Sequence, residues 1–478
     1  MRGLATCLAL LSLSSPARAG GLDFDGAGAR AIARAGTVTV SDDSTAALAH
    51  NPAGLARRAV RRAQVGIALH DHDIEYAAAQ TGSLPVQTRD APTSSPMIGY
   101  AIGWERVVAG IVYLESGDYS AITDEPRDEL YQADIGVVSD RFPHRYAGTA
   151  LTVQRRTVAA GGAMRVTPWL ALGVSIAASR VTVGEAKTVW AGFSGIDPGF
   201  PPTRDMRLSA DGTDAFVLGA HAGALVVPES VPFELALSAS YTDSARADGT
   251  ARLRSPQPTP YPAATINTSD AGLTLPYPLV LRTGGRYLGP RFNVEVDADL
   301  SLYLDDARAR SWDLDLEVQS SDALPPVAFT SARSAIDLRD HYAVRGAVDV
   351  EVVRDFVWLS AGYAFHSRVS RPAHINPVFA GMASHTFGVG AEGYWRELTI
   401  SVGYARTLSS AADVTSVRPL DNPVTGGAEL TGSGHYDRTA DAFGIAVEIA
   451  WDDYDGDLLA SPLPLPGGGA SSASTQAP

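Results

Sequence analysis

The feature that most constrains this chain is an alternation of apolar and polar residues with a period of two. It is clearest in residues 292–304, where the residues between the apolar ones carry mostly charged or amide side chains. The apolar positions there are Phe292, Val294, Val296, Ala298, Leu300, Leu302 and Leu304. Burying the charged face in a soluble core would be costly, so one face must meet water and the other an apolar surrounding.

About fourteen segments follow this rule, each close to the 9–11 residues that a tilted membrane strand needs. They lie near 62–73, 96–104, 107–116, 146–166, 168–182, 213–227, 231–252, 279–289, 291–304, 339–353, 355–368, 383–394, 396–409 and 436–451. Turn-sized gaps alternate with long ones, such as 117–145, 183–212, 253–278 and 305–338. This predicts an all-β fold, a 14-stranded antiparallel transmembrane β-barrel over residues 61–451.

Composition excludes several other classes of protein. Among 478 residues 45% are hydrophobic, yet beyond the extreme N-terminus no apolar run approaches the length of a membrane helix. The net charge of -15, without any basic run, argues against a nucleic-acid partner. No G-x-S-x-G or H-E-x-x-H motif occurs, and His70 and His72 lack further ligands, so we expect no enzyme, no metal and no cofactor.

The two ends of the chain differ from the alternating part. Residues 1–19 have the charged start, apolar stretch and A-x-A site of a signal peptide, with the sole cysteine, Cys7, inside the apolar stretch. Residues 20–60 are rich in Gly and Ala without alternation, so they must lie elsewhere than in the barrel wall. Residues 452–478 are acidic and then rich in Pro, Gly and Ser, which predicts a disordered periplasmic tail.

Candidate ligand-binding residues gather in two of the long gaps. Residues 183–212 carry Trp190, Phe193, Ile196 and Phe200, and residues 117–145 could form a facing wall with Tyr131 and Phe142. Apolar clusters in segments that should face water tend to mark ligand contact, although a loop packed on itself is an equal alternative.

Three arginines on the polar strand face are candidate partners of a substrate carboxylate: Arg282, Arg286 and Arg345. Their planar guanidinium groups bind carboxylates through two parallel hydrogen bonds. The simpler alternative is that these arginines form ion pairs that hold a plug in a hydrated lumen.

Three blocks of sequence are similar to the FadL/TodX family of outer-membrane transporters for long-chain fatty acids and hydrophobic compounds. The first is residues 42–55, which include Asn51, Pro52, Ala53 and Gly54. The second runs from Leu275 to Asp297, and the third from Leu359 to Tyr404. The resemblance implies that residues 20–60 are an N-terminal hatch that plugs the barrel. It also implies a substrate-capturing groove between two extracellular loops and hatch-gated lateral release to the outer leaflet.

The resulting prediction is passive uptake of a long-chain fatty acid or hydrocarbon across the outer membrane of a Gram-negative bacterium. The protein would be a monomer in contact with outer-membrane lipid and lipopolysaccharide. Two alternatives stay open: a non-transporting barrel that is a scaffold for secretion or surface-protein attachment, and a barrel hydrolase assembled from separate strands.

Overall fold

The computed structural model describes most of the chain between Gly28 and Trp451. The described residues are 28–58, 60–79, 85–88, 92–123, 142–190, 205–255, 265–304, 310–319, 327–415, 418–419, 428–429 and 431–451. The predicted signal peptide and tail lie outside these ranges. Within them, no helix is both long and apolar enough to span a membrane.

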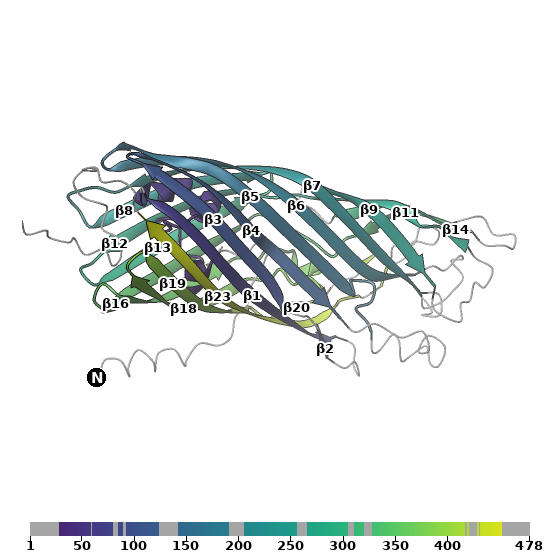
Figure 1. Ribbon diagram of the computed structural model, residues 1–478. Helices are drawn as coiled ribbons and strands as arrows, with labels where there is room; N and C mark the ends of the chain where they lie inside the picture. Colours follow the sequence, from purple (N-terminus) through teal and green to yellow (C-terminus); the bar gives the residue numbers. More distant parts are fainter. Residues whose placement is uncertain are drawn as a thin grey trace, which may run out of the picture.

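Fourteen antiparallel strands form a closed barrel, as the alternation predicted, because the last strand pairs with the first over its full length (Figure 1). In wall order they are β1 (Arg61–Ala78), β3 (Thr93–Trp104), β4 (Val107–Ile122), β5 (Ala150–Thr167), β6 (Leu170–Trp190), β7 (Asp205–Val226), β8 (Phe233–Thr242), β12 (Leu279–Leu288), β13 (Phe292–Leu302), β16 (His341–Val353), β17 (Val357–His366), β18 (Ser384–Trp395), β19 (Leu398–Ser409) and β23 (Gly434–Trp451).

The wall is apolar outside and polar inside. In β13 the apolar residues Val294, Val296 and Leu300 are exposed on the outer face, while Glu295 and Asp297 are buried in the lumen. Large aromatic side chains are exposed at the short-turn end of the barrel: Trp104, Trp169, Phe233, Phe356 and Trp395. An apolar outer band with an aromatic girdle is the surface of a membrane-spanning barrel.

Further strands extend the wall at the long-loop end, where the sequence analysis expected loops. They are β2 (Val86–Gln87), β9 (Ala245–Arg254), β10 (Thr265–Ile266), β11 (Ser269–Leu275), β14 (Ser311–Gln319), β15 (Val327–Arg333) and β20 (Ala412–Val414), with a separate pair β21 (Arg418–Pro419) and β22 (Ala428–Glu429). The expectation of loops was therefore wrong at residues 183–190, 205–212, 269–275, 311–319 and 327–333, whereas residues 276–278 and 334–338 do lie outside the strands.

The physical reason is visible in β14, where Trp312, Leu314, Leu316 and Val318 point inward between charged residues. Alternation therefore occurs here in strands that lie beyond the length that a membrane requires. The predicted strand 231–252 also breaks at residues 243–244. Beyond this break β9 continues along β7 in the same antiparallel register, pairs with β11 on its other side and starts the extension.

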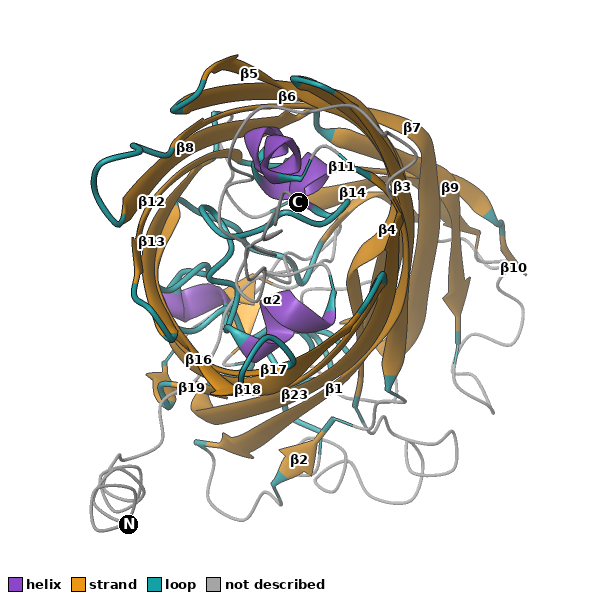
Figure 2. Ribbon diagram, turned by 60° about the vertical axis from the view of Figure 1, so that its left-hand side comes forward, coloured by secondary structure: helices purple, strands orange, loops and turns teal. Residues whose placement is uncertain are grey.

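The interior is filled differently in the two halves. At the short-turn end it holds α2 (Ala29–Ala33), α3 (Ala47–His50) and the 3-10 helix η1 (Pro52–Arg57), all inside the ring of strands (Figure 2). In the other half an apolar core lines the extension, with Tyr119, Trp312 and Phe379 among its buried members. The lumen therefore holds the hatch at one end and a packed apolar core at the other.

Candidate functional site

The hatch (residues 28–58 in the structure) is fixed to the barrel wall by all four of its arginines. Arg34 is fully buried and forms ion pairs with Glu295 of β13, at 2.5 Å, and with Asp349 of β16. Arg57 donates from both terminal nitrogens to the carboxylate of Glu234 on β8, at 2.8 and 2.7 Å. Such a two-bond arrangement is the strongest form of this contact, so the hatch is held firmly on this side.

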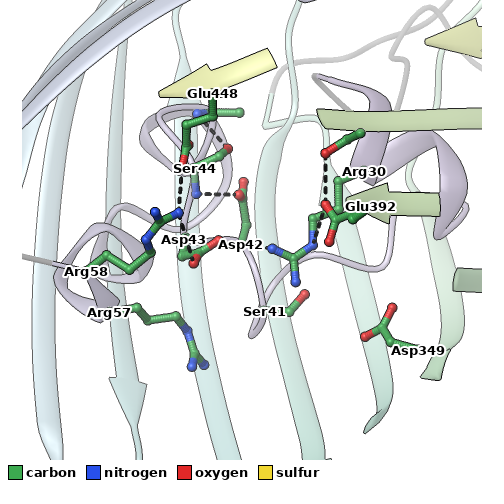
Figure 3. Close-up of polar contacts among 12 residues, drawn as sticks. Arg30, Ser41, Asp42, Asp43, Ser44, Arg57, Arg58, Asp349, Glu392 and Glu448 are labelled. Atoms are coloured by element: carbon green, nitrogen blue, oxygen red, sulfur yellow. Dashed lines mark hydrogen bonds and ion pairs between the residues drawn. The ribbon is translucent and has the colours of Figure 1, made fainter. Parts of the chain in front are cut away.

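On the opposite side, Arg30 and Arg58 hold the hatch to the last strands (Figure 3). Arg58 lies 2.5 Å from Glu448 of β23, and Arg30 lies 3.7 Å from Glu392 of β18. The hatch residue Asp43 accepts from Arg30 at 3.0 Å and is 3.9 Å from Arg58. Burial alone would raise the pKa of Asp43, but Arg30 and Arg58 outweigh it and lower this pKa to about 2.

Backbone groups of the hatch are also bound by strand carboxylates. The Val40 and Ser41 N–H groups donate to Glu295 at 2.8 and 3.2 Å, and the Thr39 N–H donates to Asp297 at 2.9 Å. These bonds satisfy a loop that would otherwise leave buried donors unpaired. The acidic inner face of β13, which first suggested a hydrated lumen, is therefore the seat of the hatch loop.

The predicted hatch motif has a structural explanation. All of Asn51, Pro52, Ala53 and Gly54 are buried. The Asn51 side chain accepts from the Ala53 N–H at 3.2 Å and donates to the Thr39 carbonyl at 2.9 Å, so it caps η1 and ties it to the preceding loop. A Cβ at Gly54 would lie 2.1 Å from the Asp42 carbonyl oxygen, so only glycine fits there.

Glycines of the wall receive helix α2, and the sequence analysis missed them. A Cβ at Gly388 would lie 2.5 Å from the Ile32 carbonyl oxygen, and one at Gly403 would lie 2.2 Å from that of Ala29. Glycine in a strand often marks such a close approach of another backbone. The signal was present in the sequence, because inward positions of two neighbouring strands carry glycine where other strands carry charge.

A polar cavity of about 230 Å³ lies between the hatch and β18, β19 and β23. Its lining includes Arg30, Asp42, Arg58, Glu392 and Glu448 and reaches the short-turn residues of the barrel. Burial raises the pKa of the Asp42 carboxyl group to about 6, because the hydrogen bonds from Ser44 and the charge of Arg30 offset it only in part. A charged cavity of this kind suits water and is a poor path for a hydrocarbon.

A second group of arginines lies on the lumen wall above the hatch. Arg345 is 2.6 Å from Asp299, and Arg282 is 3.4 Å from the same carboxylate. Arg155 donates to two hydroxyl side chains of the wall and stacks over the Tyr277 ring at 4.5 Å. Of the three arginines predicted to meet a substrate, Arg282 and Arg345 belong to this group.

The third predicted arginine, Arg286, lies lower in the lumen. It is fully buried, 3.6 Å from Glu234, which also binds Arg57 of the hatch. This placement matches the ion-pair role that the sequence analysis kept as the simpler alternative.

The comparisons with known proteins bear on this architecture. The sequence matches no protein-family model and no curated protein. The structure is similar to a FadL homologue of Pseudomonas aeruginosa, with a TM-score of 0.67 and 15% identity over 91% of this chain and 99% of the homologue. The toluene transporters TodX of Pseudomonas putida and TbuX of Ralstonia pickettii give TM-scores of 0.64 and 0.62, at 14% and 13% identity. These matches cover 90% of this chain and 100% and 99% of theirs. The chain has the FadL/TodX fold.

In this FadL/TodX barrel the two predicted groove segments meet at their bases. Arg145 forms an ion pair with Asp205 at 2.7 Å, and the Tyr146 hydroxyl donates to the same carboxylate at 2.5 Å. Trp190 packs beside Tyr146 and is buried, and Phe142 is buried nearby in the same segment. Tyr131, Phe193, Ile196 and Phe200 lie outside the described residues.

The wall of the FadL/TodX barrel divides between β3 and β4. Their pairing runs from Trp104 and Val107 up to Met97 and Leu114. Beyond that point residues 93–96 of β3 stay in register with β1, whereas residues 115–122 of β4 follow β5. The division begins at Pro96, which has no N–H to donate to a neighbouring strand. We call this region, residues 93–96 facing residues 115–122, the split.

The split lies at the outer edge of the apolar band and close to the hatch. Ser94 is opposite Leu69, the last large apolar residue on the outer face of β1 before the exposed Asp71. At the lower end of the split the Met97 side chain reaches the hatch, because a Cβ at Gly28 would lie 3.3 Å from its Cε atom. The first described hatch residue therefore touches the last paired residue of β3.

Proposed function

We propose that this protein is a passive channel that takes up hydrophobic compounds across the outer membrane of a Gram-negative bacterium. The observation that carries the proposal is the split, since the pairing of two wall strands ends there, beside the hatch and at the edge of the apolar band. A fold shared with a FadL homologue and with toluene transporters supports the same class of function. No catalytic step is part of it.

The proposed path follows the apolar surfaces of the molecule. Substrate enters at the long-loop end, where Trp190 and Phe142 belong to the base of the predicted capture groove, and descends among the apolar side chains that line the extension. An alkyl chain gains about 0.8 kcal/mol for each CH₂ that leaves water, so such a path needs no energy input. The ion-paired hatch and its polar cavity oppose passage straight through the lumen, which leaves the split as the exit.

We further propose that the substrate carries a carboxylate, as a long-chain fatty acid does. Above the hatch, Arg282 and Arg345 both lie within ion-pair distance of Asp299, and Arg155 donates to two hydroxyl side chains. Arg155 and Arg282 thus bring positive charge to this part of the wall, on the hatch side of the apolar core. A head group bound by Arg155 and Arg282 would leave its alkyl chain among apolar side chains.

Removing the charge of Arg155 and Arg282 should weaken the binding of acidic substrates and leave the binding of neutral ones unchanged. The double variant Arg155→Gln with Arg282→Gln is expected to weaken binding of a long-chain fatty acid by roughly tenfold or more, because a charged hydrogen bond contributes about 1.5–3 kcal/mol. Binding of the corresponding long-chain alkane should change little. Tryptophan fluorescence titration in detergent measures both, with Arg354→Gln in an exposed turn as the control. Equal losses for both ligands would refute a carboxylate site.

Closing the split with a disulfide tests the exit directly. If the β3–β4 register continued, Pro96 and Glu115 would be opposite each other, so Pro96→Cys with Glu115→Cys should join the two edges. The oxidised variant is expected to lose most fatty acid uptake by cells, and reduction should restore it. The single native cysteine, Cys7, lies in the predicted signal peptide, so no other thiol is expected to interfere.

The matched control is Ile98→Cys with Tyr113→Cys, a pair that is already in register. Its disulfide cross-links β3 and β4 where they are already paired and does not close the split. Uptake should therefore stay normal in both redox states. Normal uptake by the oxidised Pro96/Glu115 variant would show that substrate leaves elsewhere.

A further inference from the structure

Two arginines on the outer surface of the barrel form a site that the transport path does not use. Arg156 of β5 and Arg180 of β6 are directly opposite each other in the antiparallel register, and both are exposed on the outer face. Side chains in such positions have Cβ atoms about 5 Å apart, and like charges there destabilise the pair. Their juxtaposition calls for an anion between or above them.

The carboxylates nearby compensate only one of the two charges. Glu115 of β4 lies 3.0 Å from Arg156, whose side chain is still 50% exposed. Arg180 has no carboxylate within ion-pair distance among the described residues. In a chain with a net charge of -15, this leaves a local excess of positive charge on the outer wall.

The pair lies at the outer edge of the apolar band. Val158 is the next residue after Arg156 on the outer face of β5, toward the membrane. On β6, Ile176 lies on the membrane side of Arg180 and is 69% exposed. On the adjacent strand β7 the side chains of Phe216 and Leu218 are 64% and 54% exposed. An anion bound by the two guanidinium groups therefore has an apolar surface directly beneath it, on the membrane side.

We propose that Arg156 and Arg180 bind the phosphate of a phosphorylated lipid in the outer leaflet, whose acyl chains lie along Val158, Ile176, Phe216 and Leu218. Guanidinium groups suit phosphate because their planar forks match its oxygens. Because an apolar surface lies below the two arginines, a phosphate that carries acyl chains should bind more tightly than inorganic phosphate. This site is on the outside of the wall and is independent of which substrate uses the lumen.

The site also adjoins the split. Glu115 is the first residue of β4 past its last pair with β3, and it is the carboxylate that contacts Arg156. A bound phosphate would compete with Glu115 for Arg156. The lipid would then occupy the wall beside the point where the two strands separate.

Native mass spectrometry of the full chain in detergent tests the proposal, with diphosphorylated lipid A as the probe. Each arginine near a membrane surface contributes about 1 kcal/mol toward an anionic lipid, or about fivefold in affinity. We therefore expect Arg180→Ala to weaken binding about fivefold and the double variant with Arg156→Ala about 25-fold. Enzymatic removal of the phosphates from lipid A should weaken binding to the unaltered protein to a similar degree.

Arg406→Ala is the matched control, because Arg406 is 51% exposed at the outer edge of the opposite wall, 3.8 Å from Asp441. It should leave lipid binding unchanged. Three results would overturn the proposal: an equal loss for Arg406→Ala, unchanged binding of dephosphorylated lipid, or displacement of lipid A by millimolar inorganic phosphate. Retained barrel mobility in unheated gels shows that each variant is folded.

Discussion

Replacing Gly388 with alanine should release helix α2 from the wall, and the hatch should lose its protection from hydrogen exchange there. The added Cβ would lie 2.5 Å from the Ile32 carbonyl oxygen, 2.6 Å from that of Ala33 and 2.8 Å from the Ala35 nitrogen. Backbone atoms cannot move aside as a flexible side chain can, so the helix itself must shift. Overpacking of this kind costs about 3 kcal/mol, which corresponds to roughly a hundredfold faster exchange.

The measurement is hydrogen–deuterium exchange of residues 28–58 by mass spectrometry, compared with the rest of the chain. Gly393→Ala in the same strand is the control, since a Cβ there has nothing within 4 Å. That variant should exchange as the unaltered protein does. If Gly388→Ala behaved in the same way, α2 would not be seated against β18.

Removing Arg34 should open the barrel to ions. Arg34→Met leaves the carboxylates of Glu295 and Asp349 buried without the cation that pairs with both, and a broken buried ion pair costs about 3–5 kcal/mol. The hatch should then leave its seat often enough for a planar bilayer to show large conductance steps. In the unaltered protein such steps should be rare.

A charge-free triple variant separates the ion pairs from the packing. Arg34→Met with Glu295→Gln and Asp349→Asn has no unpaired buried charge, so conductance should return toward that of the unaltered protein. Arg354→Ala controls for loss of any arginine, because its contact with Asp355 is almost fully exposed. Closed channels in the single Arg34→Met variant would show that the hatch is held by packing alone.

The barrel could be predicted because its cause is local. A strand between lipid and water must alternate, and each of the fourteen alternating segments overlaps one wall strand. The strands of the extension were not predicted, for a related reason. Residues 311–319 alternate as clearly as residues 292–302, but their outer face meets water instead of lipid. Alternation predicts a sheet with one apolar and one polar face, but it does not tell whether the outer face meets lipid or water.

The site was harder to predict because its contacts join distant residues. Arg34 and Asp349 are separated by 315 positions, and nothing near either residue reveals the other. The inner-face charges of β13 and β16 indicated only that the lumen is hydrated and that its charged side chains form ion pairs. The resemblance placed Asn51 and Pro52 in a hatch, but their hydrogen bonds required the structure. The split could not be inferred from Pro96 alone, because a proline at the edge of a strand fits several roles.

The extension of the wall also determines where the proposed uptake would begin. Strands β6 and β7 have 21 and 22 residues, whereas a membrane requires about ten, so roughly 30 Å of wall projects beyond the lipid. Sugars and their bound ions cover the outer leaflet, and an oily molecule dissolves poorly in such a hydrated layer. The charged outer face of the projecting wall is compatible with the sugars. In the proposed uptake, its apolar inner side chains would carry the substrate past that layer.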